Sequence, residues 1–153
     1  MTELDTLNDV RSRSGKILSV DFGDVRTGLA VSDASRLLAS GIGYISVGGI
    51  EKTAQAIAES AIEQGAVAVI VGLPVNMDGS EGSRAERCKK LARLIKEASG
   101  LLVTTFDERM TTMTAARYLN ETNTRGKKRK GVIDTLSAQI ILQNCLDRLK
   151  NGQ

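Results

Sequence analysis

One stretch near the start of the chain constrains the fold more than any other. Apolar residues at 17–20 lead into Asp21, and after a polar turn that contains glycine a second apolar run follows at 29–31. This pattern predicts two antiparallel strands, 17–22 and 28–32, joined by a tight turn. A carboxylate at the end of a buried strand is costly unless it meets a cation or hydrogen-bond donors. Asp21 therefore either meets a metal ion or caps the turn, and this segment alone leaves both open.

The rest of the chain alternates between strand and helix patterns. Residues 41–48 predict a third strand, so the sheet begins as an antiparallel meander. Continuous apolar runs at 66–72 and 101–106 predict buried strands. A spacing of three to four between apolar residues predicts helices over 50–64, 85–98 and 132–149, with a short extra helix over 111–119. The order βββαβαβα, plus the extra helix, predicts a single mixed sheet with helices on its faces.

The length of 153 residues predicts one domain with a substantial core. Residues 1–15 are polar and mix acids with arginine, so we expect a flexible tail there and a single domain over 16–150. The tail lacks the apolar segment of a signal peptide, and no apolar run approaches the length of about 18 residues that spans a membrane. These features predict a cytoplasmic protein with no membrane partner.

The composition excludes several kinds of active site. The chain has no histidine, which removes Ser-His-Asp and Cys-His catalysis and every His-ligated metal site. Aromatic residues make up only 3%, so base stacking on aromatic side chains has few candidates. Cys88 and Cys145 form no CxxC motif and are expected to be buried small hydrophobic residues.

The positive charge is concentrated in one segment. Residues 125–130 hold five of the 21 basic residues, and the remaining 16 are outnumbered by the 18 acidic ones. A local basic patch suits a polyanion such as nucleic acid, although a solvated lysine loop is the alternative. The side chains expected to bind a nucleic-acid backbone here are Lys127, Lys128, Arg129 and Lys130.

Acidic residues stand where predicted elements begin or end. Asp21 follows the first strand, Asp107 and Glu108 follow the last, and Asp134 opens the last helix. If the first and last strands are adjacent and parallel, their carboxyl ends bring Asp21 close to one of the pair, because side chains alternate along a strand. An oxygen-only ligand set favours Mg²⁺ or Mn²⁺, and two such ions would activate water and stabilise the leaving oxygen of a phosphodiester. The alternatives are that Asp134 is only a helix N-terminal acid and that Asp107 pairs with Arg109.

The loop at 73–80 precedes a helix and is a candidate phosphate contact. It offers Asn76, Ser80 and backbone amides at a helix N-terminus. The alternative is a capping turn in which Ser80 or Ser83 is the N-cap.

Four motifs, in order over residues 16–149, resemble the YqgF family, also called RuvX. They are Asp21-Phe22-Gly23 with residues 26–33, residues 71–80, residues 107–112, and residues 127–130 with 132–134. The family contains Holliday junction resolvases and nucleases of ribosomal RNA precursors with an RNase H-like fold. The resemblance implies an α/β fold with a five-stranded mixed sheet and helices on both faces.

The resemblance also implies the site. It makes Asp21, Glu108 and Asp134 the catalytic metal ligands, and the choice of Glu108 over Asp107 rests on the family alone. Arg26 and Arg109 lie within the motifs and join the expected nucleic-acid contacts.

We therefore expect a metal-dependent nuclease of structured nucleic acid that processes the 5′ end of a ribosomal RNA precursor. One alternative is a Holliday junction resolvase, which would call for a homodimer with paired active sites. Another is a non-catalytic nucleic-acid-binding or transcription-associated module. A phosphotransfer enzyme of the actin and sugar-kinase type shares the Asp-x-Gly hairpin, but it needs two such domains and this chain has room for one.

Overall fold

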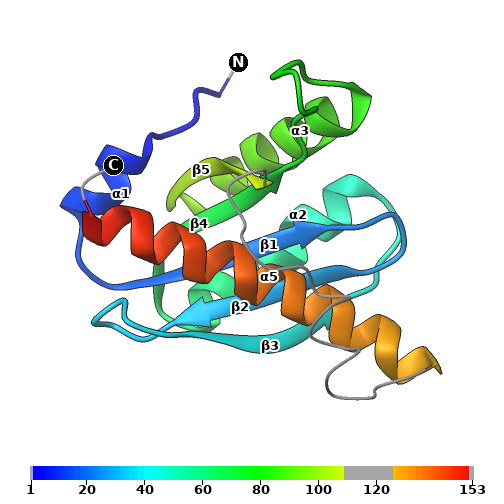
Figure 1. Ribbon diagram of the computed structural model, residues 1–153, viewed down its shortest axis with the longest axis horizontal. Helices are drawn as coiled ribbons and strands as arrows, with labels where there is room; N and C mark the ends of the chain where they lie inside the picture. The colour runs from blue at the N-terminus through cyan, green and yellow to red at the C-terminus, as the bar shows by residue number, and fades with distance from the viewer. Residues whose placement is uncertain (1, 109–125, 152–153) are drawn as a thin grey trace.

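A computed structural model describes residues 2–108 and 126–151, with side chains from residue 135 onward in the second range. Five strands form one mixed sheet in the order β3-β2-β1-β4-β5 (Figure 1). Their bounds are Lys16–Phe22 for β1, Thr27–Ser32 for β2, Ala39–Ile45 for β3, Ala66–Leu73 for β4 and Leu102–Asp107 for β5. β2 pairs antiparallel with both β1 and β3, whereas β4 pairs parallel with both β1 and β5. The predicted fold class, an α/β protein with a five-stranded mixed sheet, is confirmed.

The first and last strands are not adjacent, so that condition of the sequence argument is not met: β4 lies between β1 and β5. The continuous apolar sequence of β4 suits the middle of a sheet, where both faces are covered. Ala68, Val69, Ile70 and Val71 are all completely buried there. Since β1, β4 and β5 are parallel, their carboxyl ends still meet at one edge of the sheet.

Helices cover both faces of the sheet. α2 (Ile50–Glu63) and α3 (Ser83–Ser99) pack on one face, and the long α5 (Gly126–Asn151) crosses the other (Figure 1). Side chains of β1 alternate between the two, so Leu18 and Val20 join the α2–α3 core while Ile17 joins the α5 core. None of the helices in the described part of the chain contains an apolar stretch of membrane-spanning length. Cys88 and Cys145 are buried, as predicted.

Polar bonds fix α5 against the sheet. The buried Ser19 hydroxyl donates to the backbone carbonyl of Ala138 at 2.7 Å. At the edge strand β3, the amide of Ala39 donates to Oε1 of Gln143 at 3.0 Å, and Nε2 of Gln139 donates to the Ala39 carbonyl at 3.1 Å. These bonds position the turns of α5 that carry Ala138, Gln139 and Gln143 against β1 and β3.

The last helix begins earlier than predicted. α5 starts at Gly126 rather than near residue 132, so the basic residues 127–130 lie within its first turns and Asp134 lies in its third turn. Asp134 therefore does not open the helix. The predicted start near residue 132 left the charged run outside the helix, but lysine and arginine are good helix formers. The predicted short helix over 111–119 lies outside the described residues.

The flexible tail expected over 1–15 is not what the structure shows for residues 2–15. Leu7–Ser12 forms α1, which begins with a capping box between Thr6 and Asp9. Val10 is completely buried against α5. This segment folds because its few apolar residues meet the sheet and helix, a long-range contact that polar composition did not reveal.

Asp5 fastens the N-terminal segment to the outer edge of β5. Its amide donates to the carbonyl of Val103 at 2.9 Å, and its carboxylate accepts from the Val103 amide at 2.8 Å and pairs with Lys96. Burial raises the pKa of the Asp5 carboxyl, but the bonds from Lys96 and Val103 outweigh it and hold the pKa below its ordinary value.

Replacing Asp5 should therefore destabilise the protein in a pH-dependent way. Because the folded pKa is depressed, the carboxylate stabilises the fold fully above its ordinary pKa of 3.8 and progressively less as pH falls through the folded value. We expect Asp5→Asn to lower the free energy of unfolding by about 1 kcal/mol at pH 7, with the loss shrinking below the ordinary pKa. Denaturant titrations across pH measure it, with Glu63→Gln at an exposed position on α2 as control. An equal loss at every pH would contradict this assignment.

Candidate functional site

The carboxyl edge of the parallel strands brings Asp21 and Glu108 to the same part of the molecule. Asp21 is the penultimate residue of β1, and Glu108 directly follows β5. Ser19 faces α5, so Asp21, two residues further along the strand, projects from the same face. On β5, Phe106 packs in the α5 core, which places Glu108 rather than Asp107 on that face.

Gly72 makes room for the Glu108 carboxylate. It lies on β4 one residue beyond Val71, the partner of Val20, and so stands level with Asp21. A Cβ built on Gly72 would lie 2.6 Å from Oε1 of Glu108 and 2.8 Å from Cδ1 of Ile141. The carboxylate thus lies over the bare backbone between β1 and β5. Sequence reasoning gave Gly72 no role, although a glycine at the end of an apolar strand is a recognised sign of close approach.

Burial shapes the electrostatics of this edge. It raises the pKa of Glu108 above its ordinary value, an effect that the charge of Arg84 opposes and that of Asp107 reinforces. Burial also raises the pKa of the Cys88 thiol to about 11, with Glu108 and Asp21 contributing. Cys88 is therefore protonated at neutral pH and is not a nucleophile.

Arg84 was missed from the sequence. It stands at the start of α3, and its guanidinium donates to the carbonyl of Phe22 and to Asp24, both at 3.0 Å. The hydrogen bond to Asp24 raises the pKa of Arg84, and the nearby charge of Asp21 adds to the effect. Arg84 therefore brings a positive charge to the two carboxylates. No local pattern signals this contact, because the partners are 60 residues apart.

The donor set of this edge fits a hard divalent cation. Asp21 and Glu108 supply carboxylate oxygens, the ligands that Mg²⁺ and Mn²⁺ prefer. Among the side chains that the structure describes, no three acids or cysteines gather closely enough to hold a metal ion. Asp134, the third predicted ligand, lies in α5 with its side chain outside the described set.

The β1–β2 turn carries Arg26. Its guanidinium lies over the ring of Tyr44 on β3, 5.8 Å from the ring centroid. The turn is tight, since a Cβ on Gly23 would lie 2.3 Å from the Arg26 carbonyl oxygen. It is also tied to the end of β3, because the Ser46 hydroxyl donates to the Val25 carbonyl at 3.0 Å.

The loop between β4 and α3 is held by its own side chains. Nδ2 of Asn76 donates to the Ser80 hydroxyl at 3.0 Å, and that hydroxyl donates to Asp78 at 2.6 Å. The N-cap of α3 is Gly82, without a side-chain capping bond, so the alternative of Ser80 or Ser83 as N-cap is wrong. The proposed phosphate contact of Asn76 and Ser80 stays a prediction.

The remaining predicted contacts fall outside the side chains that the structure describes. Arg109 lies outside the described residues. The residues Lys127, Lys128, Arg129 and Lys130 lie in the first turns of α5, with their side chains outside the described set.

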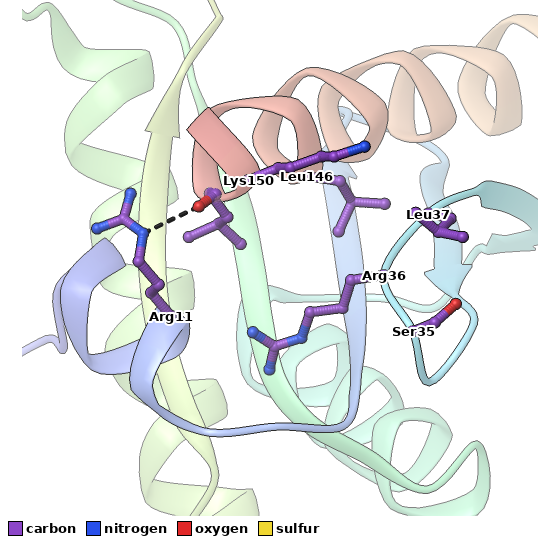
Figure 2. A pocket seen from close by; sticks show the side chains of 7 residues that line it. Arg11, Ser35, Arg36, Leu37, Leu146 and Lys150 are labelled. Atoms are coloured by element: carbon purple, nitrogen blue, oxygen red, sulfur yellow. Dashed lines mark hydrogen bonds between the residues drawn. The ribbon is translucent and has the colours of Figure 1, made fainter. Parts of the chain in front are cut away.

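A separate pocket of about 280 Å³ lies between the β2–β3 turn and the last turns of α5 (Figure 2). Its arginines bond to backbone carbonyls. Arg11 donates to Leu149 at 3.0 Å, and Arg36 donates to Gly15 at 2.7 Å and to Val10 at 2.9 Å. These cations satisfy carbonyls near the ends of α5 and α1, as expected at helix C-termini. We assign them a structural role.

Comparisons with known proteins identify a family and relatives that span most of the chain. A family model described as "RuvX: Holliday junction resolvase" matches residues 15–148. A relative from Ruminiclostridium cellulolyticum, named "Putative pre-16S rRNA nuclease", is 36% identical over 139 residues, covering 90% of this chain and 98% of the relative. A relative from Paracoccus denitrificans with the same name is 38% identical over 147 residues, covering 96% and 93%.

Solved structures share the fold at low sequence identity. The Thermus thermophilus RuvC structure in complex with a Holliday junction substrate has a TM-score of 0.58 at 11% identity, covering 89% of this chain and 96% of that one. A second Thermus thermophilus RuvC structure has a TM-score of 0.51 at 12% identity, covering 88% and 96%. These neighbours confirm the RNase H-like architecture expected from the sequence.

Substituting Gly72 should disturb the site more than the fold. In Gly72→Ala the new methyl group displaces the Glu108 carboxylate or Ile141, which we expect to lower the free energy of unfolding by about 1–3 kcal/mol. The Mn²⁺ affinity, measured by calorimetry on the folded variant, should fall about tenfold or more if Glu108 is a ligand. The control is Gly48→Ala, where an added Cβ meets nothing within 4 Å. A Gly72→Ala protein with unchanged Mn²⁺ affinity would show that the position of Glu108 does not matter to metal binding.

Proposed function

The chain belongs to the RuvX family of Holliday junction resolvases, and we propose that it is a Mg²⁺- or Mn²⁺-dependent nuclease that processes the precursor of 16S ribosomal RNA. One observation carries the proposal. Two carboxylates, Asp21 and Glu108, share one face at the carboxyl edge of the sheet, across a glycine that lets them approach. The names of the relatives supply the substrate.

We assign Asp21, Glu108 and Asp134 as the ligands of the metal, with two ions as the expected number. Support for Asp134 comes from the register of α5. It precedes Ala138 by four residues, and therefore shares that face of the helix one turn earlier. Ala138 bonds to Ser19, and Asp21 lies two residues beyond Ser19. Asp134 lies one helical turn, about 5.4 Å, from Ala138. Asp21 lies two strand residues, about 6.6 Å, from Ser19. The two acidic residues are therefore displaced by similar lengths from the bond between Ser19 and Ala138.

When bound, Mg²⁺ or Mn²⁺ supplies activation of water and stabilisation of the leaving oxygen in phosphodiester cleavage. The chain's own part is to hold the carboxylates in place and to position the substrate. Ser19 fixes α5 relative to β1, and Gly72 leaves space for Glu108. The proposed contacts to the nucleic-acid backbone are Arg26, Asn76, Ser80, Arg109, Lys127, Lys128, Arg129 and Lys130.

Resolution of four-way DNA junctions is the second candidate, favoured by the family's description and by the structural similarity to RuvC. It requires two active sites that act together, and hence a homodimer. A panel of precursor ribosomal RNA, duplex DNA and four-way junctions separates the candidates by relative cleavage rate. Sedimentation of the protein with and without a junction tests the dimer.

Neutralising any one of the three carboxylates should abolish cleavage. We expect Asp21→Asn, Glu108→Gln and Asp134→Asn each to lower the cleavage rate of precursor RNA at least a hundredfold while binding of the RNA is retained. Removing divalent metal with EDTA should have the same effect on the wild type, reversed by Mg²⁺ or Mn²⁺. The control is Asp147→Asn, at an exposed position near the end of α5. A protein with all three ligands replaced that cleaves at the wild-type rate would refute the proposal. Metal-dependent binding without any cleavage would favour a non-catalytic module.

The basic first turns of α5 should contribute salt-dependent affinity. Replacing residues 127–130 by glutamine removes four positive charges. On duplex DNA, each lost phosphate contact lowers the slope of log affinity against log salt by about 0.9. Fluorescence anisotropy of a labelled duplex at several salt concentrations measures this slope. Glutamine at Lys52 and Lys90, which are exposed on α2 and α3, provides a control that removes two positive charges elsewhere on the surface. An unchanged slope would remove residues 127–130 from the substrate interface.

A further inference from the structure

Tyr44 is the exposed member of the aromatic residues that the structure describes. Phe106 is 3% exposed and Phe22 packs partly against the α2–α3 core, whereas 53% of Tyr44 is exposed. The chain is poor in aromatic residues, so the position of this ring is informative.

The sheet register places Tyr44 on the same face as Asp21. Asp21 pairs with Gly28 on β2, and Gly28 pairs with Tyr44 on β3. Residues directly opposite one another on neighbouring strands project from the same face. Two strand spacings put the Cα atoms of Asp21 and Tyr44 about 10 Å apart. The exposed ring therefore lies beside the proposed catalytic edge.

Arg26 accompanies the ring, with its guanidinium 5.8 Å from the ring centroid. The bond from Ser46 to the Val25 carbonyl fastens the Arg26 turn to the end of β3, so the two side chains come from backbone segments that are joined to each other. Aromatic rings and arginine planes are the groups on which unpaired bases stack.

We propose that Tyr44, supported by Arg26, is a stacking platform for an unpaired nucleobase close to the scissile phosphate. The platform selects substrates with single-stranded nucleotides next to the cleavage site over continuous duplex. This inference rests on the proposed nuclease function, because it takes Asp21 to mark the cleavage site.

The absence of tryptophan from the chain makes a direct test possible. Tyr44→Trp introduces a single tryptophan at the platform, which is excited selectively at wavelengths that tyrosine does not absorb, and adding Asp21→Asn with EDTA keeps the substrate intact. Titration with a single-stranded RNA 12-mer should quench this tryptophan saturably. The matched control is Leu37→Trp, a 55% exposed site in the β2–β3 turn at the other end of the sheet, which the same RNA should leave unquenched. A 12-mer of equal charge with abasic sites should bind Tyr44→Trp with little quenching.

A second measurement uses the native ring. Tyr44→Ala should weaken binding of the labelled 12-mer about 5- to 100-fold, and Tyr44→Phe should retain wild-type affinity, because stacking needs the ring and not the hydroxyl. Affinity for a blunt duplex of equal charge should change less than twofold. Circular dichroism establishes that each variant is folded.

The outcomes separate this inference from the proposed function. Equal quenching by normal and abasic RNA, or wild-type affinity of Tyr44→Ala for the 12-mer, would overturn the platform, even if the enzyme cleaves RNA. Selective quenching of Tyr44→Trp in a protein whose wild type cleaves none of the tested substrates would support the platform and count against the nuclease.

Discussion

The parallel pairing of β4 with both β1 and β5 is the constraint on which the site depends. Parallel ladders on both sides of one strand force three chain segments to end at the same edge. Such a strand must be apolar on both faces, and the two helical layers that cover it supply the two hydrophobic cores. The same burial that stabilises β4 therefore brings Asp21 and Glu108 together, although the strands that carry them are not neighbours.

Glycine residues leave space for the acidic side chains at this edge of the sheet. One row across the sheet on the α5 face contains Tyr44, Gly28, Asp21, Gly72 and Phe106. A glycine stands on each side of Asp21, so no side chain of a neighbouring strand crowds the carboxylate within the row. The space over Gly72 is taken by Glu108, and a larger residue there would compete with it. The missing side chains thus shape the site as much as the acidic ones do.

Most of the architecture was predictable from the sequence, because hydrophobic period and turn residues fix the order of strands and helices. The position of Glu108 on the α5 face follows from strand alternation once Phe106 is known to pack in the α5 core. Other features depend on contacts between distant segments. The insertion of β4 between β1 and β5, the anchoring of Asp5 on β5 and the reach of Arg84 to Asp24 have no local signal. The start of α5 was missed because a run of charge resembles a loop as much as an amphipathic helix turn.

Both outer strands of the sheet have backbone groups that are hydrogen-bonded to other segments of the same chain. On β3, Gln139 and Gln143 take the carbonyl and amide of Ala39, and on β5 Asp5 takes both groups of Val103. An unpaired edge of this kind ordinarily recruits strands from other molecules. At these positions, two copies would have to break existing hydrogen bonds before they joined edge to edge. The glutamines and the aspartate therefore oppose edge-to-edge pairing at Ala39 and Val103.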